Sequence, residues 1–261
     1  MLLVCRVAVW PLRGLLIALA LASPAFAQTP HEDGASIAAE AKDAATQLQV
    51  YLDGVLKDGG RPDFSKPPAS DLLGQVFNLK QFEALPPAQG DDLPWLMDWA
   101  TIANGGYKSI IFFGISPPVT LSADEAAIQR NVTDYEDQAA AAGNFLLRIT
   151  AREIQASFMF IDQLPPAERT SVRMDGFNKM RVSDAEMVRS YLGWIAAGMK
   201  PANARLVSAA LRDTGEVRAT AILPADRPAV LAMLDKVQAA ATDEETRNNL
   251  SAFGSLLTKA K

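Results

Sequence analysis

The chain has 261 residues, a formal net charge of −5 and a hydrophobic fraction of 49%. A moderately acidic chain of mixed charge argues against a nucleic-acid or anionic-membrane partner. The single cysteine, Cys5, and the single histidine, His31, both lie near the N-terminus. The remaining residues therefore cannot supply Ser-His-Asp or Cys-His catalysis, cysteine-bound zinc or an iron–sulfur cluster, and we predict neither a metal site nor a cofactor.

Residues 1–27 have the three-part pattern of a secretory signal peptide. Two arginines without acidic residues precede an apolar stretch over 14–22, and Ala25-Phe26-Ala27 forms a small-x-small cleavage site. The apolar run is shorter than the roughly 20 residues of a membrane-spanning helix. We therefore expect cleavage after Ala27 and a periplasmic or secreted protein without a transmembrane span. Residues 28–35 are expected to be a flexible N-terminus, and 36–261 a single helical domain.

The first half of the domain contains apolar residues at helical spacing, separated by proline and glycine. The pattern predicts helices over about 36–58, over about 70–85 and from Pro94 onward. Asn104-Gly105-Gly106 marks either a kink within one helix or a turn before a second segment. Residues 109–115 are β-branched and aromatic, which fits a strand, but we favour a helix because no partner strand is predicted nearby.

The clearest predicted element is a long central helix over about 122–163, which keeps an apolar stripe from Ile128 to Phe160. Another helix is expected to reach about Met180, and Ser183 with Glu186 forms a capping box that predicts a new helix start. Later helices are predicted over 203–211, 227–241 and 242–261. Residues 215–223 alternate as in a strand, although their alanine content favours a helix. The sequence thus predicts an all-α, single-domain irregular bundle or array of about nine to ten helices.

The stretch from 95 to 113 is the most aromatic part of the domain, with Trp95, Trp99, Tyr107, Phe112 and Phe113. One interpretation is a surface that binds a ligand or a partner, because aromatic rings give a large contact area at low entropic cost. The alternative is that these side chains fill the core, which is the commoner position for aromatic residues and the interpretation we favour.

Glu153 lies on the apolar stripe of the predicted central helix, where an ionised carboxylate needs a partner. Arg148, Arg152, Arg181 and Arg189 are the candidate partners. We favour a buried structural ion pair, and the alternative is a catalytic acid with a raised pKa.

Three functions fit these features. The first, favoured by the helical pattern and the missing catalytic residues, is a non-enzymatic envelope protein that binds another envelope protein or scaffolds an assembly. The second is a carrier of a small apolar ligand in a cavity around the 95–113 aromatic residues. The third and least favoured is a carboxylate-dependent enzyme acting on glycans, with Glu153 and a second acid about 5 to 10 Å apart.

Overall fold

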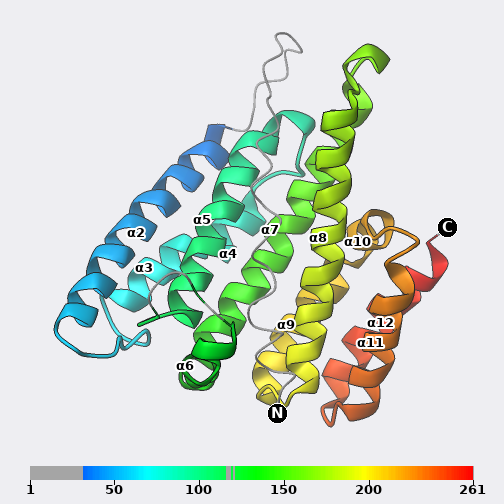
Figure 1. Cartoon of the computed structure of the whole chain (residues 1–261). Coiled ribbons are helices and arrows are strands. Elements are labelled where there is room, and N and C mark those ends of the chain that lie inside the picture. Colours follow the sequence, from blue (N-terminus) through cyan, green and yellow to red (C-terminus); the bar gives the residue numbers. More distant parts are fainter. Residues whose placement is uncertain (1–31, 116–118, 120, 261) are drawn as a thin grey trace.

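The structure, a computed structural model, describes residues 32–115, 119 and 121–260. Over these residues the chain forms helices and no strand, which confirms the predicted all-α class (Figure 1). The predicted signal peptide and residues 28–31 lie outside the described part. Helix α2 begins at Glu32, so the last four residues of the segment predicted to be flexible are helical instead. Packing explains this, because a Cβ at Gly34 would lie 2.6 Å from the Trp95 indole.

The helices follow one another in chain order. They are α2 (Glu32–Lys57), α3 (Ala69–Val76), α4 (Leu79–Ala84), η2 (Gly90–Asp92), α5 (Leu93–Ile111), α6 (Leu121–Asp134), α7 (Glu136–Gln163), η3 (Pro166–Glu168), α8 (Ser171–Ala196), α9 (Pro201–Asp213), α10 (Gly215–Ala221), α11 (Arg227–Ala240) and α12 (Glu244–Lys259). None of them, over the part of the chain described, is long and apolar enough to cross a membrane.

Helix α7 is the central element of the array. It packs against α5 on one side and α9 on another; α5 in turn packs against α2, and α9 against α12 (Figure 1). Helix α8 follows α7 through a turn and packs against α11. Because α7 has neighbours on several sides, its buried residues extend around most of its circumference, from Ala139 to Ile161.

The centre of the core is aromatic. The rings of Phe82, Trp99 and Phe145 contact one another at centroid distances of 5.2 to 5.7 Å. The indole nitrogen of Trp99 donates a hydrogen bond to the carbonyl of Val76 at 3.0 Å, so its one polar atom is satisfied although the side chain is fully buried. This cluster joins α3, α4, α5 and α7.

The long helix predicted over about 122–163 is interrupted at Tyr135, whose backbone angles of −116° and 27° lie outside the helical region. Tertiary contacts account for the break. The side-chain amide of Asn131 donates hydrogen bonds to the carbonyl of Ile111, the last residue of α5, and to that of Phe113 just beyond it. These bonds hold α6 against the end of α5, and the chain turns at Tyr135 to enter α7.

Two ambiguous segments are helical or partly so. Helix α5 continues through Asn104-Gly105-Gly106 to Ile111, so 109–115 is the last turn of α5 followed by a non-helical turn, and no strand forms. Gly106 permits a close approach, because a Cβ there would lie 3.1 Å from both Val76 and Phe77. Residues 215–221 form helix α10, which confirms the helix favoured over a strand for this segment.

The helix start predicted at Ser183 is wrong. Helix α8 runs without interruption from Ser171 to Ala196, and its observed N-cap is Thr170, whose hydroxyl accepts from the backbone N–H of Arg173. The side chains of Ser183 and its neighbour Asp184 instead line a small cavity between α7 and α8. A capping-box sequence therefore occurs here inside a continuous helix, and one of its two residues, Ser183, borders that cavity.

Candidate functional site

The five aromatic residues predicted as a binding surface belong to the core. Trp95, Trp99 and Tyr107 are 7%, 0% and 2% exposed, and Phe112 and Phe113 are half-buried against the same core. The indole nitrogen of Trp95 donates to Asp92 Oδ1 at 3.0 Å. Since three of the rings are enclosed and both indole nitrogens donate to groups within the protein, these five residues do not form an open binding face.

Glu153 is buried, as its position on the apolar stripe predicts, with 3% of its surface exposed. Among the residues that the structure describes, no bond joins its carboxyl to any of the four predicted arginine partners, and the fourth, Arg189, has its Nε buried without a hydrogen bond. Arg148 pairs with Asp213, while Arg152 and Arg181 donate to backbone carbonyls at the ends of α4 and α10. Within the described residues no hydrogen bond reaches the Glu153 carboxyl, and burial raises its pKa from 4.5 to about 7.

The buried arginine next to this region is Arg218 of α10, which the sequence analysis did not identify. It is fully buried and forms an ion pair with Asp184 of α8. Three more of its N–H groups donate to the carbonyl of Leu147 and to the hydroxyls of Thr150, at 3.1 Å, and Thr214, at 3.0 Å. Burial lowers the pKa of Arg218 to about 9, so the guanidinium stays charged at neutral pH and ties α10 to both α7 and α8.

Glu153 and Asp184 line one cavity of about 20 Å³ between α7 and α8. Its other lining side chains are Thr150 and Ile154 of α7 and Met180, Ser183 and Met187 of α8. A space of this size holds about one water molecule. It cannot admit a sugar, so the cavity does not support glycan chemistry by these two carboxyls.

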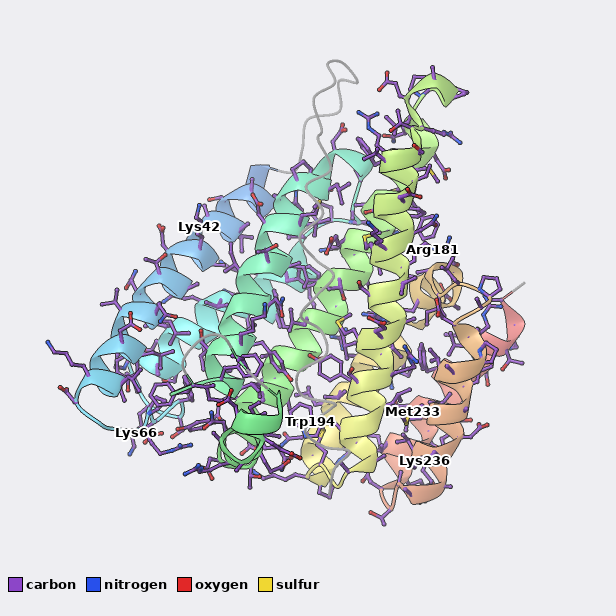
Figure 2. All side chains as sticks on the ribbon, in the orientation of Figure 1. Lys42, Lys66, Arg181, Trp194, Met233 and Lys236 are labelled. Carbon is purple, nitrogen blue, oxygen red and sulfur yellow. The ribbon has the colours of Figure 1, made fainter. Side chains whose placement is uncertain are left out.

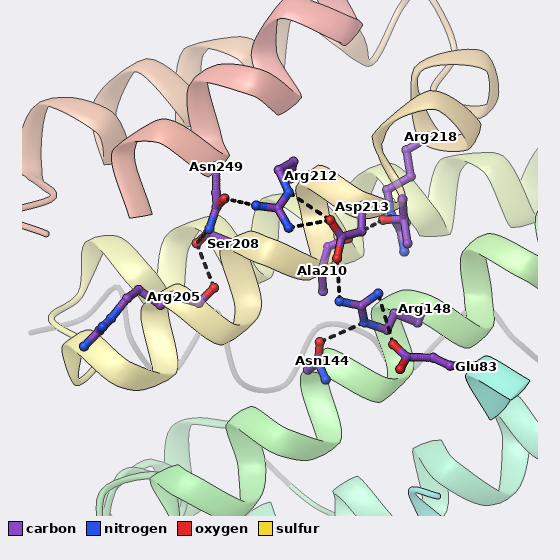
Figure 3. Close-up of polar contacts among 11 residues, drawn as sticks. Glu83, Asn144, Arg148, Arg205, Ser208, Ala210, Arg212, Asp213, Arg218 and Asn249 are labelled. Atoms are coloured by element: carbon purple, nitrogen blue, oxygen red, sulfur yellow. Dashed lines mark hydrogen bonds and ion pairs between the residues drawn. The ribbon is translucent and has the colours of Figure 1, made fainter. Parts of the chain in front are cut away.

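A second polar cluster joins α7, α9 and α12 nearer the surface (Figure 3). Arg148 Nη2 lies 2.7 Å from Asp213 Oδ2, and Arg212 Nε donates to Asp213 Oδ1 at 2.8 Å. Arg212 also donates to the side chain of Asn249, whose amide in turn donates to Ser208. The cluster borders an open cleft of about 270 Å³. The guanidinium groups of Arg148 and Arg212 are, however, both bonded to Asp213. We interpret it as a structural connection among three helices.

The most distinctive surface feature is a hairpin, which we call the apical hairpin and define as residues 158–182. It comprises the end of α7, η3 and the start of α8, and its turn projects beyond the neighbouring helices (Figure 1). A second apolar cluster fills it, formed by Ile161, Leu164 and Phe177 with Phe158, Phe160, Met174 and Met180 around them. Local contacts therefore keep this hairpin folded outside the main core.

Arg181 lies at the base of the apical hairpin (Figure 2). Its guanidinium carbon lies 5.7 Å from the ring centroids of both Phe158 and Phe177, which contact each other edge to face at 4.9 Å. The same guanidinium donates to the carbonyls of Thr220 and Ala221 at the end of α10. Arg181 thus attaches the hairpin to the rest of the protein.

The outside of the apical hairpin carries exposed apolar side chains. Met159 is 38% exposed, Val172 78% and Val182 36%. The hairpin contains the basic residues Arg169, Arg173, Lys179 and Arg181 and the acidic residues Asp162, Glu168 and Asp175. It is therefore slightly basic within an acidic chain.

Comparison with protein-family models, with curated proteins and with solved structures finds no match. Over the described residues, no group of three or more histidine, cysteine, aspartate or glutamate side chains is arranged to hold a metal ion. The candidate site therefore has to be judged from its own geometry.

Proposed function

We propose that this protein is a non-enzymatic component of the bacterial envelope that binds another protein through the apical hairpin. The observation that carries the proposal is the projecting hairpin with Met159, Val172 and Val182 exposed over an apolar cluster of its own. Exposed apolar side chains that gather on one projecting element are typical of interaction sites. Met159 suits such a site because its flexible side chain adapts to a partner.

The charge of the hairpin indicates the chemistry of the partner. Four basic and three acidic side chains give the hairpin a positive balance, whereas the chain as a whole carries −5. A symmetric dimer formed through the hairpin would bring together two surfaces with the same positive balance, which does not favour association. The surface that fits is an apolar groove on a different protein with acidic side chains at its border.

The other two functions lose the observations that motivated them. A carrier was inferred from the aromatic residues of 95–113, and three of these rings are enclosed in the core. An enzyme was inferred from a buried carboxyl, and the cavity beside Glu153 has room for about one water molecule. Partner binding is the function that an exposed feature of the structure supports.

Crosslinking from two positions tests the docking site. A photo-reactive residue at Val172 should crosslink one protein in living cells, and the same residue at Val50, which is 69% exposed on α2, serves as the matched control. The crosslinked protein is then purified, and its affinity for the chain is measured by titration calorimetry. We expect Val172→Asp to weaken binding at least about tenfold, because it places a charge in an apolar contact, and Val50→Asp to leave the affinity unchanged. Equal crosslinking from both positions, or full affinity of Val172→Asp, would contradict the proposal.

Export is part of the same proposal and rests on the pattern of residues 1–27. Mass spectrometry of the protein from fractionated cells measures its N-terminus. We expect a chain that begins at Gln28 in the envelope fraction. A chain that still begins at Met1 in the cytoplasm would contradict both the cleavage and the location.

A further inference from the structure

The cavity at the base of the apical hairpin is lined by two carboxyl groups, those of Glu153 and Asp184. Asp184 uses Oδ1 in its ion pair with Arg218, and its other oxygen, Oδ2, is buried without a hydrogen bond. The Glu153 carboxyl lines the same cavity and receives no hydrogen bond from any described residue. An unpaired buried oxygen is costly, and two ionised carboxylates that line one cavity are both acceptors and cannot satisfy each other. One proton between them removes the problem, because a protonated carboxyl is also a donor.

We infer that the base of the apical hairpin is a proton-operated hinge. Glu153 in its neutral form donates its carboxyl O–H to Asp184 Oδ2, directly or through one water molecule, and this bond closes the junction of α7 and α8. Loss of the proton breaks the bond and opens the junction to water.

The charges around Glu153 explain why its ionisation is disruptive. Asp184 of α8 lines the same cavity, and Arg218 of α10, which pairs with Asp184, is the cation of the cluster. With Glu153 neutral, these groups sum to zero. With Glu153 ionised, two buried carboxylates share one guanidinium, four of whose five N–H groups already donate to Asp184, Leu147, Thr150 and Thr214. Like charges brought together in a desolvated space repel strongly.

Two other polar groups near the cavity, those of Thr150 and Arg181, are already engaged. The hydroxyl of Thr150 donates to the carbonyl of Leu146 and accepts from Arg218. Arg181, from α8, is held by the carbonyls at the end of α10 and by two aromatic rings. Burial raises the pKa of Glu153 to about 7, which places the transition near neutral pH.

The cavity lies where movement would affect the hairpin. Met180 lines the cavity and also packs against the apolar cluster of the hairpin, while Met187 and Ile154 belong to the buried interior on its other side. Water entering between α7 and α8 at this level therefore separates the hairpin from the bundle. A role of this opening in docking rests on the proposed function. The opening itself is independent of that function.

Two spin labels measure the opening without any partner. In a chain with Cys5→Ser, cysteines replace Val172 in the apical hairpin and Ala232, an exposed residue of α11, and both are labelled with nitroxides. Pulsed electron paramagnetic resonance gives the distance distribution between the labels at about pH 5 and at about pH 8.5. We expect a narrow distribution at the lower pH and a longer or broader one at the higher pH, with a midpoint near the pKa of Glu153.

Glu153→Gln is the decisive variant, because its amide donates to Asp184 Oδ2 at every pH and carries no charge. Its distribution should stay narrow at both pH values, whereas the control Glu216→Gln, an exposed change on α10, should behave as the parent chain does. Amide exchange over 174–188, corrected for the intrinsic effect of pH, should accelerate by up to on the order of 10²-fold in the parent chain and not in Glu153→Gln.

An unchanged distribution in the parent chain overturns the hinge, and so does a pH-dependent change that persists in Glu153→Gln. These results are independent of the docking site. If the hinge opens and Val172→Asp still binds the crosslinked protein with full affinity, the docking proposal fails alone. If docking depends on Val172 and the labels do not move, the hinge fails alone.

Discussion

Glu153 and Asp213 are carboxyls in two polar clusters that both connect α7 to later helices, and their pKa values are shifted in opposite directions. Asp213 lies near the surface, with 33% of its side chain exposed. Partial burial acts to raise its pKa, but hydrogen bonds from Arg148 and Arg212 outweigh this and hold it below 3.8. Glu153 is buried without a hydrogen bond, and its pKa rises to about 7.

The position of the arginines accounts for the difference. Two guanidinium groups converge on Asp213, whereas the buried cluster has one, Arg218, and it contacts Asp184 rather than Glu153. A carboxylate with two cationic donors is stabilised in its charged form, and a carboxyl with none is stabilised in its neutral form. The surface cluster therefore loses strength when pH falls, and the buried cluster when pH rises.

Removal of Arg218 should have the largest effect on the buried cluster. Arg218→Met leaves Asp184 as an uncompensated buried charge, and we expect a loss of about 3 to 5 kcal/mol in the free energy of unfolding at neutral pH. Urea denaturation followed by circular dichroism measures the change. The double variant Arg218→Met with Asp184→Leu removes both charges and should recover most of the loss, because an apolar pair of similar volume is often as stable as a buried ion pair. A double variant as unstable as the single one would show that the charge is not the cause.

Glu153→Gln should stabilise the protein, but only at higher pH. The ordinary pKa of 4.5 applies to the unfolded chain and about 7 to the folded one, so folding favours the protonated form. Glu153 therefore does not lower the free energy of unfolding of the parent chain below pH 4.5. This free energy falls as the pH rises from there through 7, and above that it falls no further. The full difference corresponds to about 3 kcal/mol. We expect Glu153→Gln to unfold at nearly the same urea concentration as the parent at about pH 4 and at a clearly higher one at about pH 8. A variant less stable than the parent at the higher pH would contradict this assignment.

The helices were largely predictable because most of them bury one stripe, and an apolar residue every three to four positions reveals that stripe. The boundaries that failed depend on contacts far apart in sequence. The interruption at Tyr135 follows from the bonds of Asn131 to the end of α5, and the early start of α2 from the packing of Gly34 on Trp95. Local patterns carry no record of such contacts, so one long helix and a later start were the natural predictions.

The buried acid was predictable and its surroundings were not. Glu153 stands out because it interrupts an apolar stripe, which is a local signal. Its neighbours Asp184 and Arg218 come from helices 31 and 65 residues later in the numbering, and which arginine reaches the interior depends on how α8 and α10 cross α7. Ser183 and Asp184 did carry a signal, but it matched a capping box. The apical hairpin was missed because its exposure depends on its projection beyond the bundle. The spacing of apolar residues along the sequence does not show how far an element projects.

Asp213→Asn should give the smallest effect and the opposite dependence on pH. The carboxylate is stabilised by Arg148 and Arg212, and its pKa is lowered in the folded state, so its contribution is present above pH 3.8 and is lost as pH falls through the folded value. Because the Asp213 side chain is a third exposed, solvent screening limits the expected loss in the free energy of unfolding to about 1 kcal/mol at neutral pH. We therefore expect the urea midpoints of Asp213→Asn and the parent to differ slightly at about pH 7 and to converge toward about pH 3, whereas those of Glu153→Gln diverge as pH rises. Asp235→Asn, an exposed change on α11, should show neither trend. If the cost of Asp213→Asn persisted unchanged in acid, its origin would be packing rather than charge, and the contrast between the two clusters would rest on Glu153 alone.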